Sequence, residues 1–111
     1  TYESTLIRTE ISCSTALLSR NIVDAYRFST DFYHEDLVLW LEILKGGNKA
    51  SGVVEILAYY RVSRGSRASN KLKSAFERWK VIRKQMREPF FKSVVLITKY
   101  AFLAIKKYKR V

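Results

Sequence analysis

A block from Asp36 to Lys45 constrains the fold of this chain more than any other feature. Its residues (Asp-Leu-Val-Leu-Trp-Leu-Glu-Ile-Leu-Lys) are apolar on almost every face of a helix, and such a helix is normally buried. Gly46 and Gly47 follow, and glycine readily takes the left-handed conformation that ends a helix. We therefore expect a buried helix over 36–45.

The bulk composition is that of one modest globular domain. The chain has 111 residues, of which 48% are hydrophobic and 28% charged, which argues against disorder. Its single cysteine, Cys13, excludes an internal disulfide and gives no zinc site with the single His34. This favours a reduced, cytoplasmic setting. The sequence starts at Thr1 without Met or a signal peptide, so we expect a chain cut from a longer protein.

Charge is divided unevenly along the chain. Residues 1–60 hold 5 Lys or Arg and 8 Asp or Glu, whereas residues 61–111 hold 16 and 2, which together give the net charge of +11. A basic half attached to a mildly acidic half predicts an anionic partner for the basic half alone. The candidates are a membrane surface, a nucleotide diphosphate and a nucleic acid.

The first half also carries patterns typical of strands. Strands are predicted at 9–18, 49–53 and 56–62. In the last of these, Ile56, Ala58, Tyr60 and Val62 alternate with Leu57, Tyr59 and Arg61. A short helix is expected at 20–25 and a loop at 28–33. We interpret Trp40, Tyr59 and Tyr60 as core residues rather than as platforms for sugar rings.

The basic half predicts a helical hairpin. A helix over 69–87 has an apolar stripe of Leu72, Ala75, Phe76, Trp79, Ile82 and Met86, and Pro89 ends it. A helix over 91–107 carries Phe91, Val94, Val95, Thr98, Phe102 and Ile105. Lys92 and Lys99 interrupt its apolar run, which is shorter than the roughly 20 residues of a membrane span. A helix lying in the membrane interface fits it better. The alternative is that both helices pack back on the body of the protein with their Lys and Arg side chains in water.

Four blocks stand in a characteristic order: residues 34–36 (His-Glu-Asp), 37–47, 57–62 (Leu-Ala-Tyr-Tyr-Arg-Val) and 69–71 (Ser-Asn-Lys). Over residues 9–84 the chain resembles the second half of bacterial family 2 glycosyltransferases with the GT-A fold. The resemblance implies an α/β fold, the C-terminal part of a Rossmann-like GT-A domain. In isolation this would be α+β, with a few short strands, a buried helix and the helical hairpin.

The resemblance also implies a division of labour. Residues 1–65 would be the acceptor-side part of the catalytic domain, and residues 66–111 would be basic amphipathic helices. The activity implied is inverting transfer from a nucleotide sugar to a glycan or lipid-linked acceptor, in the synthesis of a bacterial cell-surface polysaccharide. The enzyme would work in the cytoplasm, peripherally on the inner face of the cell membrane, and a homodimer is a further option.

Asp36 is the candidate catalytic residue. A carboxylate within reach of an acceptor hydroxyl can take its proton. In the family that the chain resembles, the second residue of the acidic pair is this base, which implies Asp36 as base and Glu35 as its positioning neighbour. The alternative for both is helix capping, because carboxylates are favoured in a first turn. His34 is a candidate contact to acceptor or phosphate, or an ordinary polar group.

A basic loop supplies weaker candidates. Arg61, Arg64 and Ser66 could bind a diphosphate or the acceptor through charge-assisted hydrogen bonds, or they could simply be solvated. The family's Asp-x-Asp motif is missing from this sequence, as are alternating β-α units. We therefore expect the Mg²⁺ or Mn²⁺ of the parent enzyme to have its ligands outside this chain, and the fragment to be inactive alone.

Two hypotheses for a function other than glycosyl transfer remain open. The basic half could make the chain a non-enzymatic module that binds nucleic acid or anionic membrane. The apolar residues of the last helix could instead make it a helical dimerisation element. Binding of nucleic acid would explain the basic half but not the acidic first half or the His-Glu-Asp block, so nucleic acid is the less favoured partner.

Overall fold

The buried helix expected after His34 is the centre of the fold. In the computed structural model, which describes residues 1–61, 63–65 and 70–109, this helix is α3 (Glu35–Lys45). Its buried side chains are Leu37, Val38, Leu39, Trp40, Leu41 and Ile43. Gly47, at φ +91°, takes the left-handed conformation just beyond its end. The prediction of this helix, and of Trp40 as a core residue, is confirmed.

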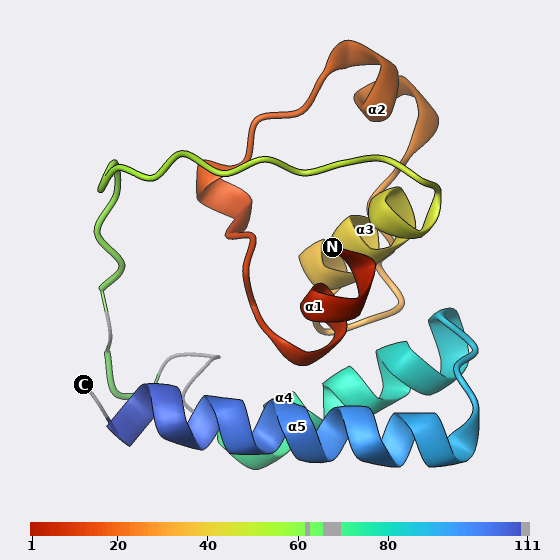
Figure 1. Ribbon diagram of the computed structural model, residues 1–111, viewed down its shortest axis with the longest axis vertical. Helices are drawn as coiled ribbons and strands as arrows, with labels where there is room; N and C mark the ends of the chain where they lie inside the picture. The colour runs from red at the N-terminus through yellow and green to blue at the C-terminus, as the bar shows by residue number, and fades with distance from the viewer. Residues whose placement is uncertain (62, 66–69, 110–111) are drawn as a thin grey trace.

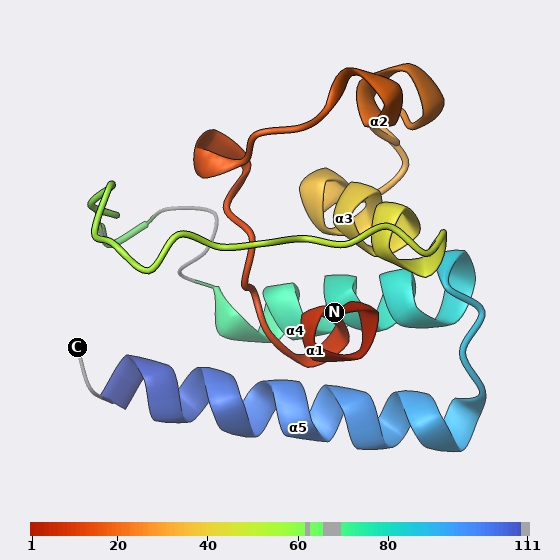
Figure 2. The same ribbon diagram turned by 45° about the horizontal axis from the view of Figure 1, so that its top comes forward.

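Other helices precede and follow α3 in the sequence. They are α1 (Tyr2–Ile7), the 3₁₀ turn η1 (Cys13–Thr15), α2 (Arg20–Ala25), α4 (Lys71–Lys80), the π-helical η3 (Val81–Gln85) and α5 (Phe90–Lys109) (Figure 1). The segment of α4 and η3 runs antiparallel to α5, and α1 packs against both α3 and α5 (Figure 2). The hairpin predicted for the basic half is thus present, and α1 joins it to α3.

The core has two clusters that share α3. The larger one contains Leu6, Leu37, Val38, Leu41, Val81, Ile82, Met86 and Leu96. The smaller one contains Leu39, Trp40 and Ile43, with Ile11, Ala16, Ile22 and Tyr26 packed against them. Because α3 buries side chains in both directions, it holds the hairpin on one side and the α2 region on the other.

The hairpin begins and turns through specific backbone contacts. The side chain of Asn70 accepts a hydrogen bond from the Lys73 N–H at 3.0 Å and caps α4. The helix then widens, because the Met86 N–H donates to the Val81 carbonyl five residues back, at 3.0 Å. Arg87 follows with φ 55° and reverses the chain before α5. Within the described residues, the two predicted C-terminal helices are confirmed.

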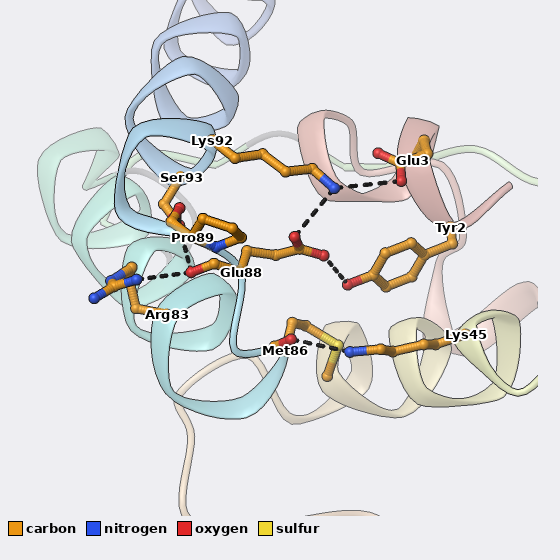
Figure 3. Close-up of polar contacts among 9 residues, drawn as sticks. All are labelled: Tyr2, Glu3, Lys45, Arg83, Met86, Glu88, Pro89, Lys92 and Ser93. Atoms are coloured by element: carbon orange, nitrogen blue, oxygen red, sulfur yellow. Dashed lines mark hydrogen bonds and ion pairs between the residues drawn. The ribbon is translucent and has the colours of Figure 1, made fainter.

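Polar side chains tie this turn to the first helix and to α3 (Figure 3). The Tyr2 hydroxyl donates to the Glu88 carboxylate at 2.8 Å, and the Lys92 ammonium lies 3.0 Å from the same carboxylate. The Lys45 ammonium donates to the Met86 carbonyl at 2.9 Å. Three distant parts of the sequence therefore meet at one turn.

The predicted strands do not form in the described residues. Residues 9–18 contain only η1 and irregular chain, and residues 49–53 and 56–61 are irregular as well; Val62 lies outside the described part. A strand needs a neighbouring strand for its N–H and C=O groups, and the described residues place none beside these segments. The α+β prediction was wrong for this part, as was a core position for Tyr59 and Tyr60, which are 93% and 76% exposed.

The C-terminal helices turn unexpected faces inward. On α4 and η3 the buried residues are Ser74, Arg78, Val81 and Ile82, while Leu72 and Phe76 are exposed. On α5, Ser93 and Leu96 are buried. Because the Ser93 side chain is small, α1 and α4 can approach this side of α5 closely. The apolar residues on the opposite side of α5 face outward. None of the helices in the described ranges is long and apolar enough to cross a membrane.

Candidate active site

The first turn of α3 brings together the three predicted residues that are adjacent in sequence. His34 precedes the helix, and its carbonyl accepts the Val38 N–H at 3.2 Å. Glu35 is exposed, whereas Asp36 is half-buried, and its Oδ1 accepts the Leu37 N–H at 2.8 Å. Asp36 therefore already performs the role of a first-turn carboxylate bound to a backbone amide. Its role as a base stays a prediction, which this geometry permits.

His34 contacts the α4 helix. Its ring is half-buried, packs edge-on against the Tyr33 ring at 5.1 Å between centroids, and hydrogen-bonds the backbone of Ser74. Burial and then the nearby charge of Arg78 lower the pKa of His34 below its ordinary value, although the Ser74 bond and nearby carboxylates oppose the shift. His34 is therefore a neutral imidazole at pH 7.

Arg78 is the residue near this site that the sequence analysis missed. Its side chain is 3% exposed, and its guanidinium donates to the backbone carbonyls of Thr5, Leu6 and Arg8 at 3.3–3.5 Å. It also stacks over the Tyr100 ring at 4.2 Å. Burial lowers the pKa of Arg78 to about 10, and the charges of Tyr100 and Asp36 oppose this shift. Arg78 thus stays charged at neutral pH.

A sequence signal for Arg78 exists in retrospect. Ser74, Arg78, Val81 and Ile82 recur at steps of three and four residues, which places them on one face of the helix. That face competes with a second one that includes Leu72 and Phe76. Arginine is rarely buried, so the sequence pattern favours the more apolar face.

The basic-loop candidates lie apart from this turn. Arg61 and Arg64 are both exposed. Both views show the segment that contains them well to one side of α3 (Figures 1 and 2). Ser66 lies outside the described residues. The structure therefore groups His34, Glu35 and Asp36 but does not bring Arg61 or Arg64 to them.

An open, mostly apolar depression of about 430 Å³ lies elsewhere, between α2 and the second half of α3. Its lining includes Ile22, Tyr26, Leu39 and Ile43 and none of the predicted site residues. The α3 residues that line it, Leu39 and Ile43, carry no group that could act as an acid or a base. In the part of the chain that the structure describes, His, Cys, Asp and Glu side chains form no group of three or more that could hold a metal ion.

Comparison with known proteins gives three similar proteins. The teichuronic acid biosynthesis glycosyltransferase TuaG of Bacillus subtilis is 36% identical over 107 residues, which is 96% of this chain and 42% of TuaG. The UDP-Glc:α-D-GlcNAc-diphosphoundecaprenol β-1,3-glucosyltransferase WfgD of Escherichia coli is 34% identical over 110 residues, 97% of this chain and 42% of WfgD. WfaP of E. coli, which has the same enzyme name, is 37% identical over 82 residues, 74% of this chain and 32% of WfaP.

The similarity to TuaG and WfgD thus runs through nearly the whole chain and matches a segment of proteins that are named as glycosyltransferases, as the resemblance implies. The chain spans about two fifths of the length of TuaG and WfgD. No family model matches the chain. No solved structure matches it either.

Proposed function

We propose that this chain forms the acceptor-side part of an inverting, nucleotide-sugar-dependent glycosyltransferase that builds a cell-surface polysaccharide on a lipid-linked acceptor. The similarity to three glycosyltransferases supports the reaction class, and the names of WfgD and WfaP support a diphosphoundecaprenol-linked acceptor and a UDP-sugar donor. The structural observation that carries the proposal is the half-buried Asp36 carboxylate in the first turn of a buried helix.

Asp36 is the general base in this mechanism. Its Oδ1 is fixed by the Leu37 N–H, and its second oxygen takes the proton of the acceptor hydroxyl. The acceptor oxygen then forms a bond to the anomeric carbon as the bond to the nucleotide diphosphate breaks, which inverts that carbon. A rigid helix suits this task, because a base must be held in the right place before the reaction.

The neighbouring candidates have supporting roles. Glu35 positions Asp36 or the acceptor, and neutral His34 offers a hydrogen bond to the acceptor or to phosphate. Arg61, Arg64 and Ser66 are proposed to contact the donor diphosphate or the acceptor through charge-assisted bonds.

The GT-A fold is proposed for the complete enzyme, with residues 1–65 in its catalytic domain and residues 66–111 as C-terminal helices. The exposed apolar side chains at 53–60 support this assignment, because a nearly continuous apolar run suits a strand that is buried on both faces by the rest of the enzyme. A divalent Mg²⁺ or Mn²⁺ is proposed for the donor side, with ligands beyond this chain. On this view the chain is inactive alone.

The proposed place of action is the cytoplasmic face of the cell membrane, where the protein would be attached peripherally. The expected acceptor supports this, because an undecaprenol carrier resides in a bilayer. A homodimer is an alternative use for the exposed apolar residues of α5. No contact within the described residues favours nucleic acid over these partners.

The test uses the complete gene product, since the chain alone is expected to be inactive. Purified protein is supplied with a panel of UDP-sugars, a diphosphoundecaprenol-linked GlcNAc acceptor in detergent, and Mg²⁺ or Mn²⁺. Asp36→Asn is expected to lower the transfer rate by about 10²-fold or more, with KM nearly unchanged. Glu35→Gln, a matched change one residue away, should lose much less. Full activity of Asp36→Asn would refute the assignment of the base.

A further inference from the structure

The outer side of α5 carries a row of apolar side chains that nothing in the described chain covers. Its members are Phe91, Val95, Phe102 and Ile105, which are 84%, 51%, 67% and 59% exposed. They recur at steps that keep them on one side of a helix. The opposite side packs inward through Ser93 and Leu96. We call these four residues the outer stripe.

A row of lysines runs beside the outer stripe. Lys92, Lys99 and Lys106 recur every seven residues, so they lie on one line along α5 next to the stripe. Lys92 is paired with Glu88, whereas Lys99 and Lys106 are exposed and have no acidic partner among the described residues. Both views place α5 at the edge of the molecule (Figures 1 and 2). The stripe and its cations therefore face outward together.

Aromatic rings extend the apolar surface at the start of α5. The Phe91 ring contacts the Phe90 ring at 5.8 Å between centroids, and the Phe90 ring contacts the Trp79 ring of α4 at the same distance. The Arg83 guanidinium lies 5.7 Å from the Phe90 ring. Tryptophan and phenylalanine next to cations are typical of the boundary between lipid headgroups and acyl chains.

We propose that the outer stripe of α5 lies in the interface of an anionic phospholipid bilayer, with Lys99 and Lys106 on lipid headgroups. This rests on the proposed function, because a lipid-linked acceptor would be presented at the same surface. The charge of residues 61–111 suits this partner, since they include 16 basic residues and only 2 acidic ones. A second copy of the chain suits the stripe less, because it would bring another row of lysines, and like charges repel.

The experiment is vesicle co-sedimentation of the complete gene product. Vesicles of phosphatidylcholine alone are compared with vesicles that also contain phosphatidylglycerol. We expect binding only to the anionic vesicles, weakened by salt. Phe102→Glu should lower the apparent affinity about tenfold or more, because it places a carboxylate in the bilayer interface. Leu72→Glu makes the same kind of change at an exposed apolar residue of α4 and should bind much better than Phe102→Glu.

Lysine variants test the electrostatic half of the proposal. Lys99→Glu should weaken binding to anionic vesicles more than Lys84→Glu, which reverses an exposed charge on η3. Circular dichroism confirms that each variant is folded. Equal losses for Phe102→Glu and Leu72→Glu, or no binding to anionic vesicles, would overturn the proposal. So would stronger binding to random oligonucleotides, or a concentration-dependent dimer that Phe102→Glu dissolves in the absence of vesicles.

The membrane contact and the catalytic assignment fail independently. Vesicle binding requires neither donor nor Asp36, so Asp36→Asn is expected to bind vesicles normally. Phe102→Glu is expected to retain transfer to the detergent-solubilised acceptor while losing vesicle binding. If the protein binds vesicles through the outer stripe but has no transferase activity, the proposed function is rejected and the membrane-binding role of the stripe stands. If transfer depends on Asp36 but the protein does not bind vesicles, the proposed function stands and the membrane-binding role is rejected.

Discussion

The hydroxyl of Tyr2 donates a hydrogen bond of 2.8 Å to the carboxylate of Glu88, which joins the first helix to the turn before the last one (Figure 3). The bond also links two titrating groups. Burial raises the pKa of Tyr2 above its usual range, and the Glu88 carboxylate adds to this rise. For Glu88, burial acts to raise the pKa, but the bonds from Tyr2 and Lys92 and the charges of Lys92 and Lys45 outweigh it and lower the pKa.

Acid should weaken this contact between Tyr2 and Glu88. Because the pKa of Glu88 is lower in the folded state than in the unfolded state, its contribution to stability is present above the unfolded pKa and is lost as the pH falls below about 4. Glu88→Gln is expected to reduce the stability at pH 7 and to flatten this part of the pH dependence. Urea titrations between pH 7 and pH 3 measure both effects. An unchanged acid limb in Glu88→Gln would contradict the assignment.

His34 offers a direct reading of the candidate site, because it is the only histidine in the chain. Its pKa is lowered by burial and by Arg78, so its imidazole signals in an NMR titration should shift at a pH below about 6.5, the usual histidine value. As the pH falls below about 6.5, His34 binds a proton in the unfolded state before it does so in the folded state, and the stability of the fold decreases. Glu77→Gln removes a carboxylate that raises this pKa and should move the midpoint lower still. A midpoint above the usual value would contradict this placement of His34.

Arg78 should hold the first segment of the chain in place. Arg78→Met keeps most of the side-chain volume but leaves the buried carbonyls of Thr5 and Leu6 without their donor, at a cost of about 1–3 kcal/mol. Hydrogen exchange should rise over residues 2–9 more than over α3. Lys84→Met, an exposed change on η3, serves as the control and should leave exchange near its original level. Equal protection in the two variants would show that Arg78 is dispensable.

Gly46 has a close neighbour that restricts substitution. A Cβ at this position would overlap the hydroxyl oxygen of Tyr26, which also accepts a hydrogen bond from Asn48 at 3.2 Å. Gly46→Ala is therefore expected to reduce stability by about 1 kcal/mol or more. The loss should be smaller when Tyr26→Phe is made first. Thermal unfolding of the four proteins of this double-mutant cycle tests the coupling, and additive effects would exclude the overlap.

Some of the fold could be predicted from local sequence and some could not. The helix α3 was predictable because its residues are apolar on nearly all faces and glycines follow it. The inward face of α4 was not, since choosing between the Arg78 side and the Phe76 side depends on what packs there. Strand patterns at 56–61 were also insufficient, because a strand exists only beside a partner.

The candidate site divides in the same way. His34, Glu35 and Asp36 are adjacent in sequence, so the first turn of one helix brings them together. Arg78 comes from a distant helix and reaches His34 and Asp36 only through the packing of α4 on the rest of the fold. The positions of Arg61 and Arg64 depend on a loop that lies to one side of α3, and no local pattern specifies where such a loop lies.

The exposed stretch from 53 to 60 has a practical consequence for work with this chain. Val54, Tyr59 and their apolar neighbours project into solvent, and within the described residues their backbone groups have no hydrogen-bond partner. Such a stretch can pair with any strand that reaches it, including the same stretch of another molecule. A solution of the isolated chain should therefore become cloudy sooner as its protein concentration is raised.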